Sequence, residues 1–181
     1  MDSEKTGRLR SGLDDALSNL MAVLPGADNE PGWAIATGDE DWTVRQTLAH
    51  LASAESSMIA LIERAFAAAQ AGQSIGALLS RGSDGQPFDV HVWNRRQVEK
   101  RAQQPPSALR LELTEARAQT LRALKPLSPD QLATPAWHPA LGDTTVEGIF
   151  KLMAIHMRAH TSAIKKALRA GIQGRYWADV E

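Results

Sequence analysis

Two histidines four residues apart, His156 and His160, are the side chains of this chain that are best placed to do chemistry. Residues at positions i and i+4 of a helix lie one above the other, so two imidazoles at this spacing can converge on one metal ion. Two buried imidazoles without partners would leave several ring nitrogens unsatisfied, which is costly. Two interpretations therefore stay open: a core pair with its hydrogen bonds met, and part of a metal site that needs a third ligand.

The segment that carries this pair has the periodicity of an amphipathic helix. At about 100° per residue, its apolar side carries Val146, Ile149, Phe150, Met153, His156, Met157, His160, Ile164 and Ala167. The opposite side carries Glu147, Lys151, Arg158, Lys165 and Lys166. We therefore expect both histidines to point toward the core.

His50 lies in a second helical region, which opens at residues 41–45 with Thr43 or Asp41 available as the N-cap. The apolar stripe of this helix is centred on Val44, Leu51, Met58 and Ile62, and His50 lies near one edge of it. An edge position suits a side chain that reaches toward a neighbouring helix, and it suits a surface histidine almost equally well.

Glu55 falls on the apolar side of the same helix, where a carboxylate needs a partner. It could form an ion pair with an arginine such as Arg45 or Arg95. It could instead act as an acid/base group, or orient groups near a metal. Glu55 lies about 140° around the helix from His50, so we do not expect it to be a direct ligand.

A third helical region begins near residues 88–89 and is broken by Pro105-Pro106, after which Ser107 can restart it as N-cap. We expect Trp93 in the core, and Asn94 either to line a pocket or to cap a local turn. His91 is expected at the surface. The same expectation applies to His138, which precedes a proline in a connecting segment.

Composition narrows the classes of function. The chain has 181 residues, a net charge of −1 and no cysteine. The balanced charge gives no indication of a nucleic-acid or anionic-membrane surface, and no apolar run is long enough for a membrane span or a signal sequence, so a cytoplasmic protein is expected. Without cysteine, a metal must be held by histidine, carboxylates or carbonyls. Any thiol chemistry must use a thiol that is brought in from outside.

The periodicity predicts four long helical regions and no convincing strand, which favours an all-α four-helix bundle with a broken third helix and long connecting loops. The first region ends at Pro25-Gly26, and residues 143–145 cap the last. The loop over 72–88 is expected to contain a short helical piece from Ile75 to Leu79. The whole chain, 1–181, is interpreted as a single domain.

One pattern resembles a known family. Asp41-Trp42-Thr43-Val44-Arg45-Gln46-Thr47-Leu48-Ala49-His50-Leu51, followed about a hundred residues later by His156-Met157-Arg158-Ala159-His160, is similar to the DinB/YfiT-like superfamily of metalloenzymes. This superfamily includes bacillithiol-dependent transferases and mycothiol-dependent maleylpyruvate isomerases. Isomerase relatives tend to place a glutamate where this chain has His156, so that branch is less favoured.

The resemblance implies a four-helix bundle that binds a divalent metal through His50, His156 and His160. Three imidazoles with an open position are typical of a catalytic rather than a structural site, and they suit Zn²⁺, Ni²⁺, Fe²⁺ or Co²⁺. The function expected first is a metal-dependent transferase or hydrolase acting on a small molecule, with a low-molecular-weight thiol as a candidate partner. Glu55 and Asn94 are the further site candidates.

Two alternatives are a metal- or small-ligand-binding stress-response bundle without turnover, and a bundle whose histidines are structural and whose main property is formation of a homodimer. His-Met-Arg-Ala-His lacks the glutamate of the zincin signature, which argues against a metalloprotease.

Overall fold

The computed structural model describes residues 2–26, 29–38, 42–76 and 86–178. Its helices and strands, in chain order, are α1 (Asp2–Val23), α2 (Glu30–Trp33), α3 (Val44–Gln70), α5 (Val90–Glu99), α6 (Pro106–Leu124), α7 (Pro129–Leu132), β1 (Pro135–His138), β2 (Gly142–Thr145) and α8 (Val146–Ala178). No helix in these ranges is both long enough and apolar enough to cross a membrane.

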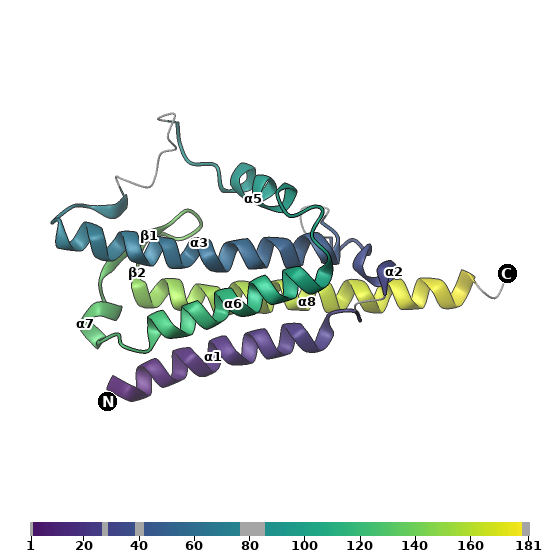
Figure 1. Ribbon diagram of the computed structural model, residues 1–181, viewed down its shortest axis with the longest axis horizontal. Coiled ribbons are helices and arrows are strands. Elements are labelled where there is room, and N and C mark those ends of the chain that lie inside the picture. The colour runs from purple at the N-terminus through teal and green to yellow at the C-terminus, as the bar shows by residue number, and fades with distance from the viewer. Residues whose placement is uncertain (1, 27–28, 39–41, 77–85, 179–181) are drawn as a thin grey trace.

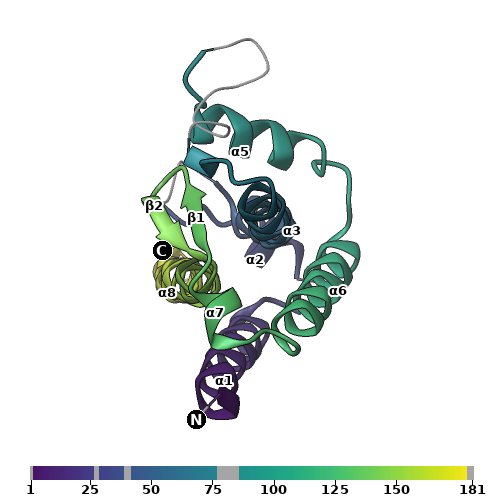
Figure 2. The same ribbon diagram turned by 90° about the vertical axis from the view of Figure 1, so that its left-hand side faces the viewer.

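The long helices α1, α3, α6 and α8 form the bundle (Figure 1). α3 packs against α6 and α8, and α1 packs against α8 and α6, so each helix has two neighbours in a closed ring. Figure 2 shows this ring nearly end-on, with α5 lying outside it beside α3. The predicted all-α four-helix bundle with a broken third helix is confirmed.

The starts of α3 and α6 lie where local chemistry favours a helix. Thr43 caps α3: its hydroxyl accepts the amide of Gln46, whose side chain accepts the Thr43 amide in return. The break in the third helix lies where the sequence predicts it, but Pro105 is the extended residue before α6, and Pro106 is the first helical residue. The prediction of Ser107 as the cap was therefore wrong. Asp41, the other predicted cap of α3, lies outside the described residues.

A short antiparallel hairpin precedes α8 and was not predicted. β1 and β2 pair from Pro135 with Thr145 to His138 with Gly142. Gly142 has a φ of 69°, a conformation that glycine adopts without strain. Strands of four residues, one of them flanked by prolines, carry too little alternation to be seen in the sequence. Of the predicted helical piece 75–79, residues 77–79 lie outside the described ranges.

A buried ion pair lies where the four bundle helices meet. Arg117 of α6 donates from Nε to Oε1 of Glu55 on α3 at 2.7 Å, and from Nη2 to Oε2 at 3.0 Å. Both side chains are at most 3 % exposed. Thr120 donates to Oε1 at 2.7 Å, and Arg117 also donates to the carbonyl of Leu13 on α1. The Sδ atom of Met157 on α8 lies 3.6 Å from Nη2.

Removing one partner of this pair should destabilise the protein strongly. Arg117→Met leaves the Glu55 carboxylate buried without its counter-charge, and we expect a loss of about 3 to 5 kcal/mol in the free energy of unfolding, measured by urea denaturation. The double variant Arg117→Met/Glu55→Leu should recover most of that loss, because two apolar side chains leave no charge to desolvate.

Arg8→Met is the matched control, since Arg8 pairs with Glu4 at the surface with both side chains more than 60 % exposed. It should change stability by at most about 1 kcal/mol. Equal losses for Arg8→Met and Arg117→Met would contradict a structural role of the buried pair.

Candidate metal centre

Three imidazoles from two helices converge on one point. His50 projects from α3, and His156 and His160 project from α8. Nε2 of His156 lies 3.0 Å from Nε2 of His50 and 3.1 Å from Nε2 of His160. A ligand atom from each of the three histidines lies within 4.8 Å of the other two. The structure thus brings together the three histidines named as metal ligands from the sequence.

The surroundings of the cluster hold the rings in place. His50 and His160 are buried and His156 is half-buried. Trp42, just before the α3 cap, packs on His50 with ring centroids 4.9 Å apart. Ser53, one turn further along α3, is also buried, and its hydroxyl donates to the carbonyl of His50 at 2.8 Å. The capped start of α3 therefore fixes the depth at which His50 enters the bundle.

Burial keeps the imidazoles of His50 and His156 neutral. The pKa of His50 is lowered from 6.5 to about 2, first by burial and then by the neighbouring His156 and His160 rings. The pKa of His156 is lowered to about 3, first by burial and then by His160 and His138. Neutral imidazole is the form that binds a metal ion, so no proton has to be displaced at neutral pH.

The donor set fits a divalent metal. Ligand nitrogens about 2.0 to 2.1 Å from a tetrahedral Zn²⁺ lie about 3.3 Å from one another, close to the two Nε2 separations seen here. Without an ion, Nε2 of His156 can serve only as a donor or as an acceptor, so it cannot form a good hydrogen bond to both neighbours. One ion accepting three lone pairs would satisfy all three atoms.

The second ring nitrogen of His50, Nδ1, lacks a hydrogen bond among the described residues. This atom is also buried. Histidines that bind metals usually donate this second N–H to a carboxylate, a carbonyl or water.

His138 is closer to the site than the sequence indicated. The prediction that it is exposed was wrong, since only 9 % of its surface is accessible. Ala136 and His138 alternate along β1 and are buried together, because this strand packs on α3 and α8. Nδ1 of His138 accepts the Ala140 amide at 3.1 Å, which leaves Nε2 as the protonated nitrogen of the neutral ring. Burial lowers the pKa of His138 as well.

Glu55 faces away from the three imidazoles and toward Arg117. The predicted partners, Arg45 and Arg95, were wrong: Arg45 instead donates to the carbonyl of Gln104, at 3.1 Å from Nε and 2.6 Å from Nη2. Both carboxylate oxygens of Glu55 already accept hydrogen bonds from α6. A partner 62 residues away in the chain gives no signal in the local sequence pattern.

Asn94 is half-buried on α5, which packs against α3. Its place in a pocket stays a prediction.

Trp93, expected in the core, is 41 % exposed and packs on Phe88 with ring centroids 6.0 Å apart. It was misassigned because α5 lies outside the bundle and buries only one edge. His91 is exposed, as predicted.

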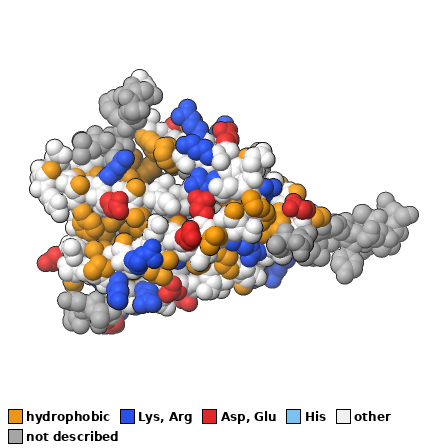
Figure 3. Space-filling model, viewed as in Figure 1, with side chains coloured by type: hydrophobic (Ala, Val, Ile, Leu, Met, Phe, Trp, Pro, Cys, Tyr) orange, Lys and Arg blue, Asp and Glu red, His pale blue; other side chains and the backbone are white. Residues whose placement is uncertain are grey.

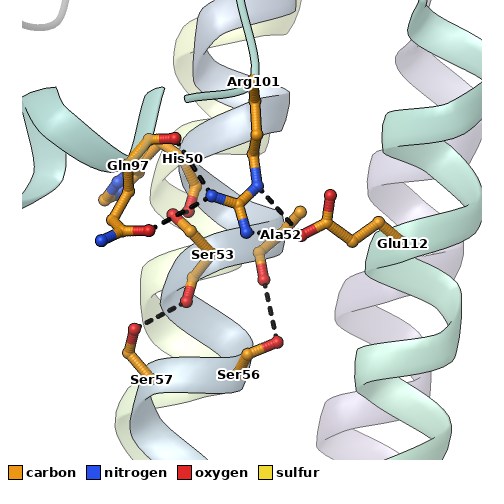
Figure 4. Close-up of polar contacts among 8 residues, drawn as sticks. All are labelled: His50, Ala52, Ser53, Ser56, Ser57, Gln97, Arg101 and Glu112. Carbon is orange, nitrogen blue, oxygen red and sulfur yellow. Dashed lines mark hydrogen bonds and ion pairs between the residues drawn. The ribbon is translucent and has the colours of Figure 1, made fainter. Parts of the chain in front are cut away.

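One arginine ties α5 to the bundle. Arg101 donates to Oε1 of Glu112 on α6, at 2.9 Å from Nε and 2.6 Å from Nη2. Its Nη1 donates to the carbonyl of Gln97 on α5 at 3.0 Å. Figure 4 shows this bridge crossing the α3 segment that carries His50 and Ser53. Arg101 therefore links the C-terminal end of α5 to α6.

The chain belongs to the DinB superfamily, whose model matches residues 8–164. Among solved structures it is similar to YfiT from Bacillus subtilis, described as "a probable metal-dependent hydrolase with an unusual four-helix bundle topology", at 20 % identity and a TM-score of 0.65, covering 94 % of this chain and 89 % of YfiT. A second similar structure is an uncharacterised protein from Clostridium difficile 630, at 14 % identity and a TM-score of 0.58, covering 93 % and 95 %. None of the curated proteins compared matches the chain. At these identities the two structures support the fold.

Replacing one imidazole should abolish metal binding without unfolding the protein. His160→Ala removes one of three donors, whereas most of the stability of the bundle comes from apolar burial. We expect metal content after dialysis against Zn²⁺ to fall to background while helicity by circular dichroism is retained. His91→Ala, at an exposed histidine, is the control and should bind as the unchanged protein does. Loss of helicity in His160→Ala would show that the cluster is structural.

The metal-free protein should lose stability as pH falls below about 6.5. The folded-state pKa values of His50 and His156 are depressed to about 2 and about 3, so the unfolded chain binds more protons between those values and 6.5. Stability therefore rises with pH through this window and is fully present above it.

Urea unfolding of chelator-treated protein at a series of pH values measures this dependence. His156→Gln removes one depressed group and should flatten the pH dependence, while His91→Gln should leave it unchanged. An equal slope in all three proteins would contradict the neutral, buried state of the cluster.

Proposed function

We propose that this protein is a divalent-metal-dependent enzyme that acts on a small molecule at a site formed by His50, His156 and His160. The observation that supports the proposal is the convergence of three imidazole Nε2 atoms, with that of His156 lying 3.0 and 3.1 Å from the other two. Three imidazole donors leave at least one coordination position for a substrate or water, as in catalytic zinc sites. When bound, the ion supplies Lewis acidity and lowers the pKa of a coordinated water or thiol toward neutrality.

The residues of the chain have separate tasks in this proposal. The three imidazoles hold the ion without adding negative charge. Trp42 covers His50 on one side, and β1, which packs on α8, carries the buried His138 with Nε2 as its protonated nitrogen. Asn94 is kept as a candidate for the pocket wall. We assign Glu55 to stability rather than catalysis, because Arg117 and Thr120 occupy its oxygens.

Two reactions fit this site. In hydrolysis, the nucleophile is water. In thiol transfer, a low-molecular-weight thiol supplies the sulfur, because the chain contains no cysteine. The description of YfiT as a probable metal-dependent hydrolase favours hydrolysis. The thiol-dependent transferases of the superfamily that the sequence resembles favour thiol transfer. Zn²⁺, Ni²⁺, Fe²⁺ and Co²⁺ all suit three imidazoles, so the metal must be measured.

The second candidate function is a metal- or ligand-binding bundle without turnover. It is supported by the same cluster, since three histidines can bind an ion whether or not a reaction follows.

A cytoplasmic location and a homodimer are further parts of the proposal. Size-exclusion chromatography with light scattering tests the dimer.

Paired activity assays distinguish these functions. Metal-loaded protein is tested for hydrolysis of activated esters and for conjugation of cysteine or glutathione to monochlorobimane, against free metal at equal concentration. We expect a rate above that of the free metal in one assay, lost in His160→Ala and restored in the unchanged protein when metal is returned after chelation. Tight binding of metal with no rate above the free metal would favour the binding bundle.

Glu55→Gln tests the division of tasks. The variant removes the charge that faces Arg117, so it should lower the melting temperature. Metal-dependent activity below that temperature should change by less than about threefold, whereas loss of a group that orients a metal ligand costs about 10- to 100-fold. A large loss of activity in a variant with an unchanged melting temperature would return Glu55 to the site.

A further inference from the structure

A groove of about 440 Å³ runs between α1 and α8, away from the three histidines. Its floor is apolar and is formed by Leu9, Phe150 and Ala154, which are buried, with Ile155 beside them. Ile155 is 59 % exposed, among the most exposed large apolar side chains of the described chain. A volume of this size is in the range that holds small ligands.

Cations surround this floor. Lys5, Arg8, Lys151 and Arg158 line the groove together with a single carboxylate, Glu147. Glu147 is shared, because Lys5 lies 2.5 Å and Lys151 2.7 Å from its two oxygens. These contacts lower the pKa of Glu147, first through the hydrogen bond from Lys151 and then through that from Lys5. Arg8 is already paired with Glu4, so the excess of positive charge in the groove comes from Arg158 and from the two lysines that share one carboxylate.

Arg158 is the cation that is best placed to meet a ligand. One of its terminal nitrogens, Nη2, donates to the carbonyl of Gly12 at 3.0 Å, which fixes the guanidinium across the groove. No carboxylate of the described residues forms an ion pair with it. A guanidinium presents five N–H donors in a fork that matches a carboxylate or a phosphate, so most of them remain for an anion.

The groove and the histidine cluster occupy different sides of α8. Ala154 and Arg158 are each two residues from His156, which places them about 160° from it around the helix. The groove is shared with α1, whereas the cluster is shared with α3. Occupation of one site therefore does not require the other.

We propose that this groove binds a small anion with an apolar body, of the class of a medium-chain carboxylate. The anionic head would pair with Arg158 on α8, and the apolar body would cover Ile155 and the floor. The apolar body of such a ligand would remove Ile155 and the groove floor from water. Its anionic head would compensate positive charge that Glu147 does not neutralise. Figure 3 shows that on the face drawn there, positive and negative side chains are interspersed, so a local excess of one sign is not the general pattern of that face.

The proposal is tested with octanoate as the probe, by isothermal titration calorimetry on the full chain. Octanamide, which has the same body without the charge, is the matched ligand control. We expect saturable binding of octanoate that weakens as salt rises, and binding of octanamide that is at least about tenfold weaker, since a hydrogen bond to a charged group contributes about 1.5 to 3 kcal/mol. No saturable binding of octanoate, or equal binding of the two ligands, would overturn the proposal.

Variants locate the site. Arg158→Gln should raise the dissociation constant about tenfold or more, and Lys166→Gln, an exposed cation on α8 outside the groove, should leave it unchanged. Ile155→Ser is the second variant: its side chain is exposed, so the fold does not depend on it, and it should also weaken binding. Equal effects of Arg158→Gln and Lys166→Gln would overturn the proposal. His160→Ala should bind octanoate normally, and loss of binding there would place the ligand at the histidine cluster instead.

Discussion

The buried pair of Glu55 and Arg117 sets the positions of the other elements. Two charges removed from water are tolerated only when the geometry is good and the remaining hydrogen-bonding groups are satisfied. Here Thr120 and the Leu13 carbonyl complete the set, and Met157 packs against the guanidinium. One contact point thereby reaches α1, α3, α6 and α8. A shift of α1, α3 or α6 along its axis would leave a buried polar group of this set without its partner, so the pair favours a single register.

That register brings the histidines together. Met157, which contacts Arg117, lies on α8 directly after His156 and three residues before His160. On α3, Glu55 lies five residues after His50. The ion pair joins α3 to α6, whereas the imidazoles join α3 to α8, so the two features share only α3. Their polar demands are therefore met separately: the carboxylate is neutralised by arginine, and the imidazoles of His50 and His156 remain neutral through burial. Stability and chemistry can share α3 without competing for the same charges.

Local sequence signals predicted the long helices. The partner of Glu55 and the burial of His138 and Trp93 depend on contacts between residues far apart in the sequence, which these signals do not carry. The 3.6-residue period identified the long helices, and the Thr43 cap and the prolines at 105–106 marked their limits. The two α8 histidines followed from their spacing, but His50 joined them only through the family resemblance, because its position at a stripe edge is ambiguous. Arg117 could not be chosen over Arg45 or Arg95, since pairing across α3 and α6 depends on tertiary register. His138 and Trp93 were misplaced because the burial of a hairpin and of an outlying helix depends on what packs over them.

The neutrality of the three donors constrains what the site can accept. Three imidazoles would leave the charge of a divalent ion uncompensated in a largely buried place, where Coulomb interactions are stronger than in water. The nearest buried carboxylate in the sequence of α3, Glu55, is already neutralised by Arg117, so it cannot supply the missing charge. An anionic ligand, such as a thiolate, a carboxylate or hydroxide, is therefore favoured over a neutral one of the same shape. This preference is common to hydrolysis and thiol transfer, and it explains why the donor set alone does not choose between them.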